Sequence, residues 1–283
     1  MTDPDRLVRS ADGTAIAVFE SGTAAPGTRP LILVHGTTAD HLTFRVVGPL
    51  LGQRRRLYAI DRRGRGASGD AQDRYSITRE FEDVAAVADA VAVASDGPGD
   101  VVGHSFGGRC ALGAVLLTRS IRRVVCYEGA PPRDSREASA YEPAWLVARL
   151  QDDLARGDAE ALLERFMRTV VGMDDDAMAR FRADAVWPLR VAAAPTILRE
   201  LEASSDPAAG LEALASVPVP VLQVLGSAGP PAFALNTAAL DARLAVGRVV
   251  VIDGAAHAAH HTHASAFVAA VEAFLDEPDA AVD

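Results

Sequence analysis

Cysteine is scarce in this sequence, and its pattern excludes two common kinds of site. The 283 residues include two cysteines, Cys110 and Cys126, which lie in separate apolar segments. They form no CxxC pair and have no adjacent histidine, so neither a disulfide framework nor a thiolate metal site is indicated. We expect both to be reduced core residues of a cytoplasmic protein.

Long apolar runs and an excess of basic residues are also missing. No stretch approaches the ~20 apolar residues of a membrane span. The acidic start, with Asp3 and Asp5 and no apolar run behind them, leads us to expect no secretory signal. The 38 acidic residues outnumber the 28 arginines, giving a formal charge of -10. This balance disfavours nucleic acid and anionic membranes as partners.

The segments that are present alternate between two kinds of secondary structure over the first 130 residues. Hydrophobic residues make up 49% of the chain, enough for a full core. Short apolar runs predict strands at 15–19, 31–34, 57–60, 101–102 and 124–127. Helical spacing predicts helices at 77–94 and 109–117. Short apolar strands separated by helices indicate an α/β protein whose parallel sheet is covered on both faces.

The alternation of predicted strands and helices ends after residue 130. Residues 131–215 are helix-forming and contain no convincing strand, whereas strands return at 219–225 and 248–252, before a final helix at 265–275. We therefore predict one sheet domain, built from residues 1–130 and 216–283, that is interrupted by a helical cap at 131–215.

The most informative motif is Gly103-His104-Ser105-Phe106-Gly107. It follows the apolar run at 101–102 and opens a helix, which is the setting of a nucleophile elbow. A serine hydroxyl is a weak nucleophile at neutral pH, so it needs a base to remove its proton. Ser105 is therefore the predicted nucleophile, provided that a base lies at the same edge of the sheet.

His257 is the predicted base. It follows the strand at 248–252 through a short Gly/Ala loop, which places it at the carboxyl edge of a parallel sheet. The alternative is that His257 only caps the last helix. His260, His261 and His263 come next without acidic residues at ligand spacing, so we expect the exposed start of a helix and no metal site.

These motifs resemble those of the α/β-hydrolase fold superfamily. The resemblance also includes His35-Gly36-Thr37 and the loop Asp61-Arg62-Arg63-Gly64-Arg65-Gly66-Ala67-Ser68. It implies a mostly parallel sheet of eight strands with helices on both faces, and an enzyme that needs no cofactor. It further implies an oxyanion hole made by the backbone N–H groups of Thr37 and Phe106. His35, Asp61 and Arg62 are expected to be structural.

The chain departs from this family where the third member of the triad usually lies. The expected carboxylate position is Gly229, and Glu128, at the end of the strand at 124–127, is the best substitute. Some members of the fold take their acid from there, and Cys126-Tyr127-Glu128 resembles zearalenone lactonases in particular. The alternatives are that Glu128 is a solvent-exposed residue at the start of the cap, or that Asp253 is the acid.

The resemblance predicts a serine hydrolase that cleaves a small carboxylic ester or lactone with Ser105, His257 and Glu128. The same residues could also cleave a carbon–carbon bond in a β-diketone-like substrate or form a peracid. A ligand-binding protein without activity is the alternative from another class, because position 229 lacks its acid. The aromatic residues of the predicted cap either line a substrate pocket or pack between helices; they are Trp145, Phe166, Phe181 and Trp187.

Overall fold

A sheet of eight strands forms the centre of the molecule, which a computed structural model describes at residues 3–71, 75–133 and 144–278. The strand order is β1-β2-β4-β3-β5-β6-β7-β8. The strands are β1 (Arg6–Arg9), β2 (Ala15–Ser21), β3 (Leu31–Val34), β4 (Leu57–Ile60), β5 (Gly99–His104), β6 (Ile121–Tyr127), β7 (Val221–Gly226) and β8 (Gly247–Ile252). From β4 to β8 all neighbours are parallel, while β2 is antiparallel to both β1 and β4. The predicted fold class is confirmed.

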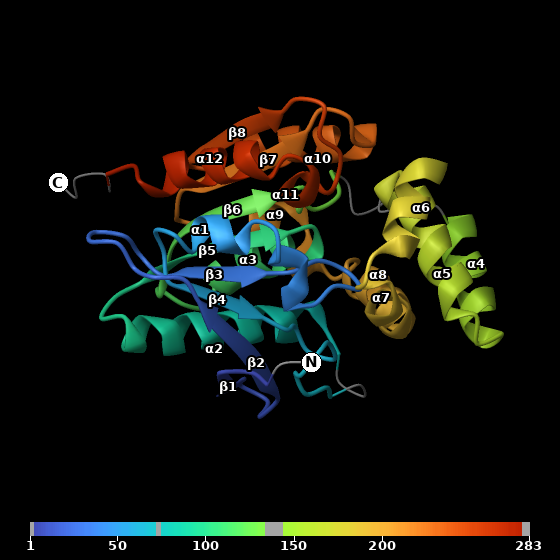
Figure 1. Cartoon of the computed structure of the whole chain (residues 1–283), viewed down its shortest axis with the longest axis horizontal. Helices are drawn as coiled ribbons and strands as arrows, with labels where there is room; N and C mark the ends of the chain where they lie inside the picture. Colours follow the sequence, from blue (N-terminus) through green and yellow to red (C-terminus); the bar gives the residue numbers. More distant parts are fainter. Residues whose placement is uncertain (1–2, 72–74, 134–143, 279–283) are drawn as a thin grey trace.

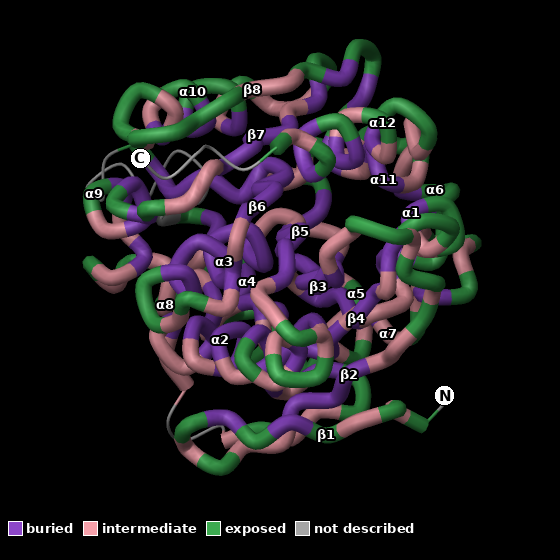
Figure 2. Tube along the Cα trace, turned by 90° about the vertical axis from the view of Figure 1, so that its left-hand side faces the viewer, coloured by how far each residue is buried: buried purple, intermediate pink, exposed green. Residues whose placement is uncertain are grey.

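Most residues of the central strands are buried, as Figure 2 shows for β3 and β6. Adjacent residues in such a strand point to opposite faces of the sheet. Ile32 packs into the hydrophobic cluster on one face and Leu33 into the cluster on the other. This two-sided burial explains why the predicted bounds of β3 and β4 match the observed ones, since both strands are continuous apolar runs.

The strand β1 is not predicted by the hydrophobic pattern. It begins and ends with arginine, and within it only Val8 is buried, because β1 is an edge strand of the sheet. An edge strand has one neighbour and needs fewer apolar side chains, so it leaves a weak signal in the sequence.

Helices cover both faces of the sheet (Figure 1). On one face α2 (Ile77–Ala94) packs against α3 (Phe106–Val115), with Phe81 directly over Gly113. On the other face α1 (Gly48–Leu51) and α12 (Ala264–Leu275) complete the second cluster. The remaining helices near the sheet are α9 (Leu211–Leu214), α10 (Pro231–Asp241) and α11 (Ala259–Thr262). Within the described ranges, no helix is long and apolar enough to cross a membrane.

A separate group of helices lies beyond one end of the sheet, between β6 and β7 in the chain (Figure 1). It consists of α4 (Ala144–Ala155), α5 (Ala159–Phe166), the π-helical turn η4 (Met167–Val171), α6 (Asp175–Ala183), α7 (Trp187–Ala193) and α8 (Ile197–Ala203). We call residues 144–203 the helical insertion. Its core is a hydrophobic cluster of its own, which includes Leu150, Leu163 and Ile197. Of the predicted cap, residues 134–143 lie outside the described residues.

Candidate active site

Ser105 lies on a sharp turn between β5 and α3. Its backbone has a φ of 54° and a ψ of −126°, a conformation that costs free energy for any residue with a side chain. The flanking glycines make this turn possible. A Cβ atom on Gly103 would lie 2.4 Å from the carbonyl oxygen of Gly107, and one on Gly107 would lie 2.4 Å from that of His35. The motif therefore needs glycine at both positions to bring strand and helix together.

Glu128 lies on a similar turn at the end of the next strand, β6. Its φ is 45°, and it is 3% exposed, so the solvent-exposed alternative is wrong. Its Oε2 atom is 2.5 Å from Nδ1 of His257, and its Oε1 atom accepts a hydrogen bond of 2.8 Å from the N–H of Gly226. Because Glu128 occupies Nδ1, the imidazole keeps Nε2 for proton transfer.

Gly229, the family's usual acid position, lies next to this carboxylate. A Cβ atom on Gly229 would be 3.5 Å from Oε1 of Glu128, so the two positions serve the same region of space. Asp253, the other sequence candidate, is exposed and accepts a hydrogen bond of 3.0 Å from the hydroxyl of Ser227. Among the carboxylates of the described residues, Glu128 is the one that contacts the imidazole of His257.

The ring of His257 is held on several sides. Phe233 of α10 stacks on it, with ring centroids 4.6 Å apart and an angle of 17° between the planes. The backbone carbonyl of His257 accepts a hydrogen bond of 2.9 Å from Nε2 of His104. These contacts fix the imidazole in a buried position beside Ser105, since both residues line the same cavity.

Three further histidines surround His257 and form no metal site. Burial lowers the pKa of His104 and of His260 well below 6.5, and it lowers the pKa of His261 to about 4. The rings of His104 and His260 are 4.4 Å apart and share contacts with Tyr127. The expectation that His260 is exposed is wrong, because it is 2% exposed. In the part of the chain that the structure describes, no cluster of ligating side chains could hold a metal ion.

The residues of the predicted oxyanion hole flank the nucleophile. Phe106 is the first residue of α3, where backbone N–H groups have no acceptor within the helix. Thr37 follows Gly36, whose added Cβ would lie 2.9 Å from Cβ of Ser105. A small cavity of about 40 Å³ is lined by Thr37, Ser105 and Phe106 together. The two residues of the predicted oxyanion hole therefore line the same cavity as the predicted nucleophile.

The loop after β4 has the structural role that the sequence indicates. His35 accepts a hydrogen bond of 2.9 Å at Nε2 from the N–H of Arg62, and its Nδ1 is 2.9 Å from the carbonyl of Gly36. Burial lowers the pKa of His35 well below 6.5, so it is neutral. Asp61 accepts hydrogen bonds of 2.8 Å from the N–H groups of His41 and Ala67.

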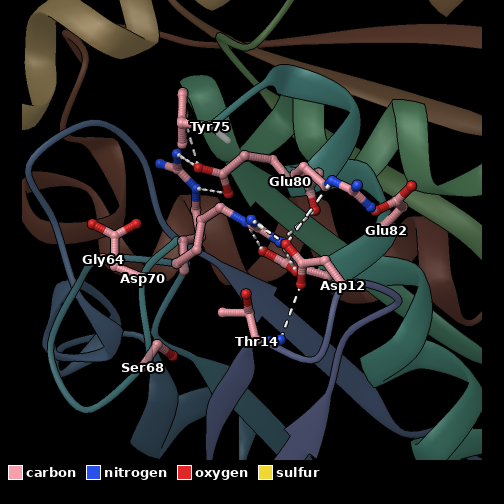
Figure 3. Close-up of polar contacts among 12 residues, drawn as sticks. Asp12, Thr14, Gly64, Ser68, Asp70, Tyr75, Glu80 and Glu82 are labelled. Atoms are coloured by element: carbon pink, nitrogen blue, oxygen red, sulfur yellow. Dashed lines mark hydrogen bonds and ion pairs between the residues drawn. The ribbon is translucent and has the colours of Figure 1, made fainter. Parts of the chain in front are cut away.

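The arginines of this loop are buried in ion pairs. Arg62 contacts Glu80 at 2.7 Å, and Tyr75 donates a hydrogen bond of 2.9 Å to the same carboxylate (Figure 3). In the same figure Asp12 accepts a hydrogen bond of 3.0 Å from the N–H of Thr14. The guanidinium of Arg62 also lies 4.6 Å from the ring centroid of Phe106. Because Phe106 directly follows Ser105, this contact supports the nucleophile turn.

Glu200 is a residue of the site that sequence analysis missed. It lies in α8, is 1% exposed, contacts Arg62 at 2.5 Å and also pairs with Arg65. Glu200 therefore attaches the helical insertion to the loop that supports Phe106. An isolated glutamate within a helix carries no motif, so nothing in the sequence singles it out.

The cavity at Ser105, which we call the site cavity, has a volume of about 340 Å³ and lies between the sheet edge and the helical insertion. Ser105 and His257 line it from the core. Phe166 and Phe181 line it from the insertion, so these aromatics belong to the pocket. Trp187 instead packs edge-on against Phe181, at 5.2 Å and 86°, and Trp145 is 56% exposed.

Comparisons with known proteins agree with this arrangement. The family model described as "Alpha/beta hydrolase family" matches residues 31–271. A pimeloyl-(acyl-carrier protein) methyl ester esterase of Neisseria meningitidis serogroup A is 30% identical over 267 residues, which cover 88% of this chain and 79% of that protein. The crystal structure of an alpha/beta hydrolase from Sphaerobacter thermophilus is similar with a TM-score of 0.76 at 27% identity, covering 94% of this chain and all of the other.

An enol-lactonase from Burkholderia xenovorans shares the fold, with a TM-score of 0.72 at 20% identity, and the match covers 96% of this chain and all of that chain. The chain therefore belongs to the alpha/beta hydrolase family. It is an enzyme of the hydrolase class, and its similarity to esterases is in keeping with hydrolysis of a carboxylic ester.

Proposed function

We propose that this enzyme is a cofactor-independent serine hydrolase that cleaves a carboxylic ester or a lactone through a triad of Ser105, His257 and Glu128. The observation that carries the proposal is the 2.5 Å contact between Glu128 and Nδ1 of His257, at the cavity that Ser105 also lines. The esterase of Neisseria, 30% identical, supports ester cleavage in general. The alternative of a protein without activity depends on the missing acid at Gly229, and the contact of Glu128 with His257 supports the catalytic interpretation instead.

The proposed reaction proceeds through an acyl-enzyme. Oγ of Ser105 attacks the substrate carbonyl while Nε2 of His257 takes the hydroxyl proton. The carboxylate of Glu128 orients the imidazole and stabilises its positive charge. The N–H groups of Thr37 and Phe106 stabilise the oxyanion, a contribution of ~10²–10³ in rate for each such donor.

His257 then donates the proton to the leaving oxygen, which departs as an alcohol or remains attached when the substrate is a lactone. Water, activated by the same imidazole, hydrolyses the acyl-enzyme and restores Ser105. In this scheme residues 131–215 form a cap that shapes the substrate pocket, while residues 1–130 and 216–283 carry the chemistry.

A fluorophosphonate probe with an intact-mass readout tests the proposal. We expect wild type to be labelled rapidly at Ser105, and Ser105→Ala to show neither labelling nor ester hydrolysis. Glu128→Gln should be labelled slowly and should lose about 10³–10⁴ in kcat for a p-nitrophenyl ester, as other triads do without their acid.

Asp253→Asn is the matched control, because it removes the alternative carboxylate near His257, and it should behave like wild type. Rapid labelling of Glu128→Gln would move the acid to another residue. Labelling of Ser105→Ala would overturn the assignment of the nucleophile.

A further inference from the structure

Arg190 is a buried arginine in the wall of the site cavity. It lies in α7, is 7% exposed, and lines the same cavity as Ser105 and His257. Its Nη2 atom donates a hydrogen bond of 3.2 Å to the hydroxyl of Thr43. Within residues 3–71, 75–133 and 144–278, no carboxylate lies within ion-pair distance of Arg190.

This lack of a carboxylate distinguishes Arg190 from four of the six other buried arginines among the described residues. Removing a guanidinium from water is costly unless an opposite charge or several acceptors replace the solvent. Four other buried arginines of this protein each have a carboxylate partner: Arg55 with Glu272, Arg62 with Glu80, Arg63 with Asp83 and Arg65 with Glu200. Arg190 has one neutral acceptor, so most of its five N–H donors are free to bind another group.

Arg190 remains charged at neutral pH. Burial lowers its pKa to about 10, still well above physiological pH. The cavity wall also holds the ion pair of Arg45 with Asp184 and the exposed Arg180. Asp40 and Asp184 act on Arg190 from beyond ion-pair distance and offset part of the effect of burial on its pKa. Arginines still outnumber carboxylates among the residues that line the cavity, so its wall is positive on balance, although the chain as a whole carries a formal charge of -10. The histidines beside it do not add to this charge, because burial and the nearby arginines keep the pKa of His260 and of His261 low.

The small cavity that Ser105 also lines offers less to an anionic group. Its wall holds two carboxylates, Glu128 and Glu200, beside one arginine, Arg109, and its volume is only about 40 Å³. A substrate with one negative end would therefore place that end in the larger site cavity, toward Arg190, and its ester carbonyl at Ser105. The cavity volume of about 340 Å³ suits a small molecule of this kind.

We propose that Arg190 is a substrate-binding residue that recognises a free carboxylate, so that the esters or lactones cleaved here are small molecules with a second, ionised carboxyl group. The planar guanidinium matches a carboxylate with two parallel N–H···O bonds, a geometry that lysine cannot supply. This inference rests on the proposed function for the reacting group, and it adds the chemical class of the substrate.

Two esters of equal length test the inference. Mono-(4-nitrophenyl) glutarate carries the free carboxylate, and methyl 4-nitrophenyl glutarate has it blocked. The measured quantity is the ratio of kcat/KM for the charged ester to that for the neutral one. Wild type should favour the charged ester by at least about tenfold, and Arg190→Gln should lower the ratio by about 10- to 100-fold, the range of a charged hydrogen bond. Arg190→Lys should give an intermediate ratio.

Arg182→Gln is the matched control. Arg182 also lies in the helical insertion, but it pairs with Glu164 and lies over the ring of Trp187 instead of lining the cavity. The variant Arg182→Gln removes the same charge as Arg190→Gln. A general electrostatic effect would therefore change the ratio of the two kcat/KM values equally in both variants. A ratio unchanged in Arg190→Gln, or no preference in wild type, overturns the proposal and leaves Arg190 as a structural partner of Thr43.

Binding without turnover separates this inference from the proposed function. Glutarate should raise the Tm of wild type and inhibit the neutral ester competitively, whereas glutaramide should do neither. If neither ester is cleaved and no fluorophosphonate label appears, the proposed function fails, yet a glutarate-dependent rise in Tm would still support the carboxylate site. If glutarate does not raise the Tm of wild type, the proposed carboxylate site is overturned. This measurement needs only wild type, so it also applies if Arg190→Gln does not fold.

Discussion

Ser105 and Glu128 share an uncommon backbone conformation on neighbouring parallel strands. Both have positive φ values, 54° and 45°, directly after β5 and β6. The N–H of Ser105 donates a hydrogen bond of 2.8 Å to the carbonyl of Tyr127, the residue before Glu128. The sheet ladder thus holds the two turns in a fixed relation, and the surrounding structure supports strain that costs of order 1–3 kcal/mol per residue.

The nearness of Gly229 predicts that the acid can be moved. Glu128→Ala should lose most of the activity, and adding Gly229→Asp should recover at least about tenfold, since activity depends on where the carboxylate lies and not on which strand carries it. The measurement is kcat for a p-nitrophenyl ester in the single and double variants. The structural reason is the 3.5 Å between Oε1 of Glu128 and a Cβ atom at position 229.

Gly229→Asn in the Glu128→Ala background serves as the control, because it fills the same space without a charge. Equal recovery by asparagine and aspartate would show that the effect is one of packing and would count against the shared carboxylate region.

The site residues differ in how far the sequence alone reveals them. Ser105 and His257 follow from motifs at the ends of predicted strands, and Glu128 follows from the empty position at Gly229. Arg190 and Glu200 carry no such signal. The roles of these two residues are inferred from their burial and from the presence or absence of an ion-pair partner. Both depend on how a helix packs and not on local sequence spacing.

At the scale of elements, α8 is attached to the core by charge. Glu200 is buried between Arg62 and Arg65, which belong to the loop after β4. Burial raises the pKa of Glu200, but the two arginines lower it more, so the carboxylate is ionised. A second contact on the same helix joins Arg199 to Asp70 at 2.8 Å.

Glu200→Gln should weaken this attachment, because it leaves Arg65 buried without its carboxylate. Loss of one partner of a buried pair typically costs about 3–5 kcal/mol, and we expect the free energy of unfolding to fall by about that amount. Glu202→Gln, an exposed residue of the same helix, should change it by less than about 0.5 kcal/mol. Chemical denaturation measures both, and equal effects of the two variants would argue against the ion pair as the attachment.

The elements were predictable to the extent that their burial is visible in the sequence. The strands β3 and β4 and the helix α2 have the predicted bounds, because apolar runs and helical periodicity mark them. Among the described strands, the edge strand β1 pairs only with β2 and buries one residue, and the π-helical turn η4 directly continues α5. Neither element therefore shows a hydrophobic periodicity of its own.

At the scale of the whole molecule, buried histidines make stability depend on pH. Burial lowers the pKa of His35, His104 and His260 well below 6.5, and it lowers the pKa of His261 to about 4. The folded protein keeps them neutral, whereas the unfolded chain binds protons below pH 6.5, so stability is lost as the pH falls. Asp83 acts in the opposite sense, because burial raises its pKa to about 6.

We therefore expect the free energy of unfolding to decrease by about 3–4 kcal/mol between pH 7 and pH 5.5, with each of the four histidines contributing about 1 kcal/mol and Asp83 offsetting part of the sum. Urea denaturation at the two pH values measures the change. His260→Asn should reduce it by about one histidine's share. A free energy that stays constant between these pH values would contradict the prediction.

The hydrophobic cluster of the helical insertion is separate from the two clusters that enclose the sheet. Ser105, Glu128 and His257 all belong to the sheet side, while Arg190 belongs to the insertion. Apart from Glu200, whose ion pairs with Arg62 and Arg65 reach the loop behind Phe106, the helical insertion can therefore change with the substrate without disturbing the packing that holds the nucleophile turn. In evolutionary terms, the reaction and its selectivity are inherited as two separable parts, and recombination could exchange one while preserving the other.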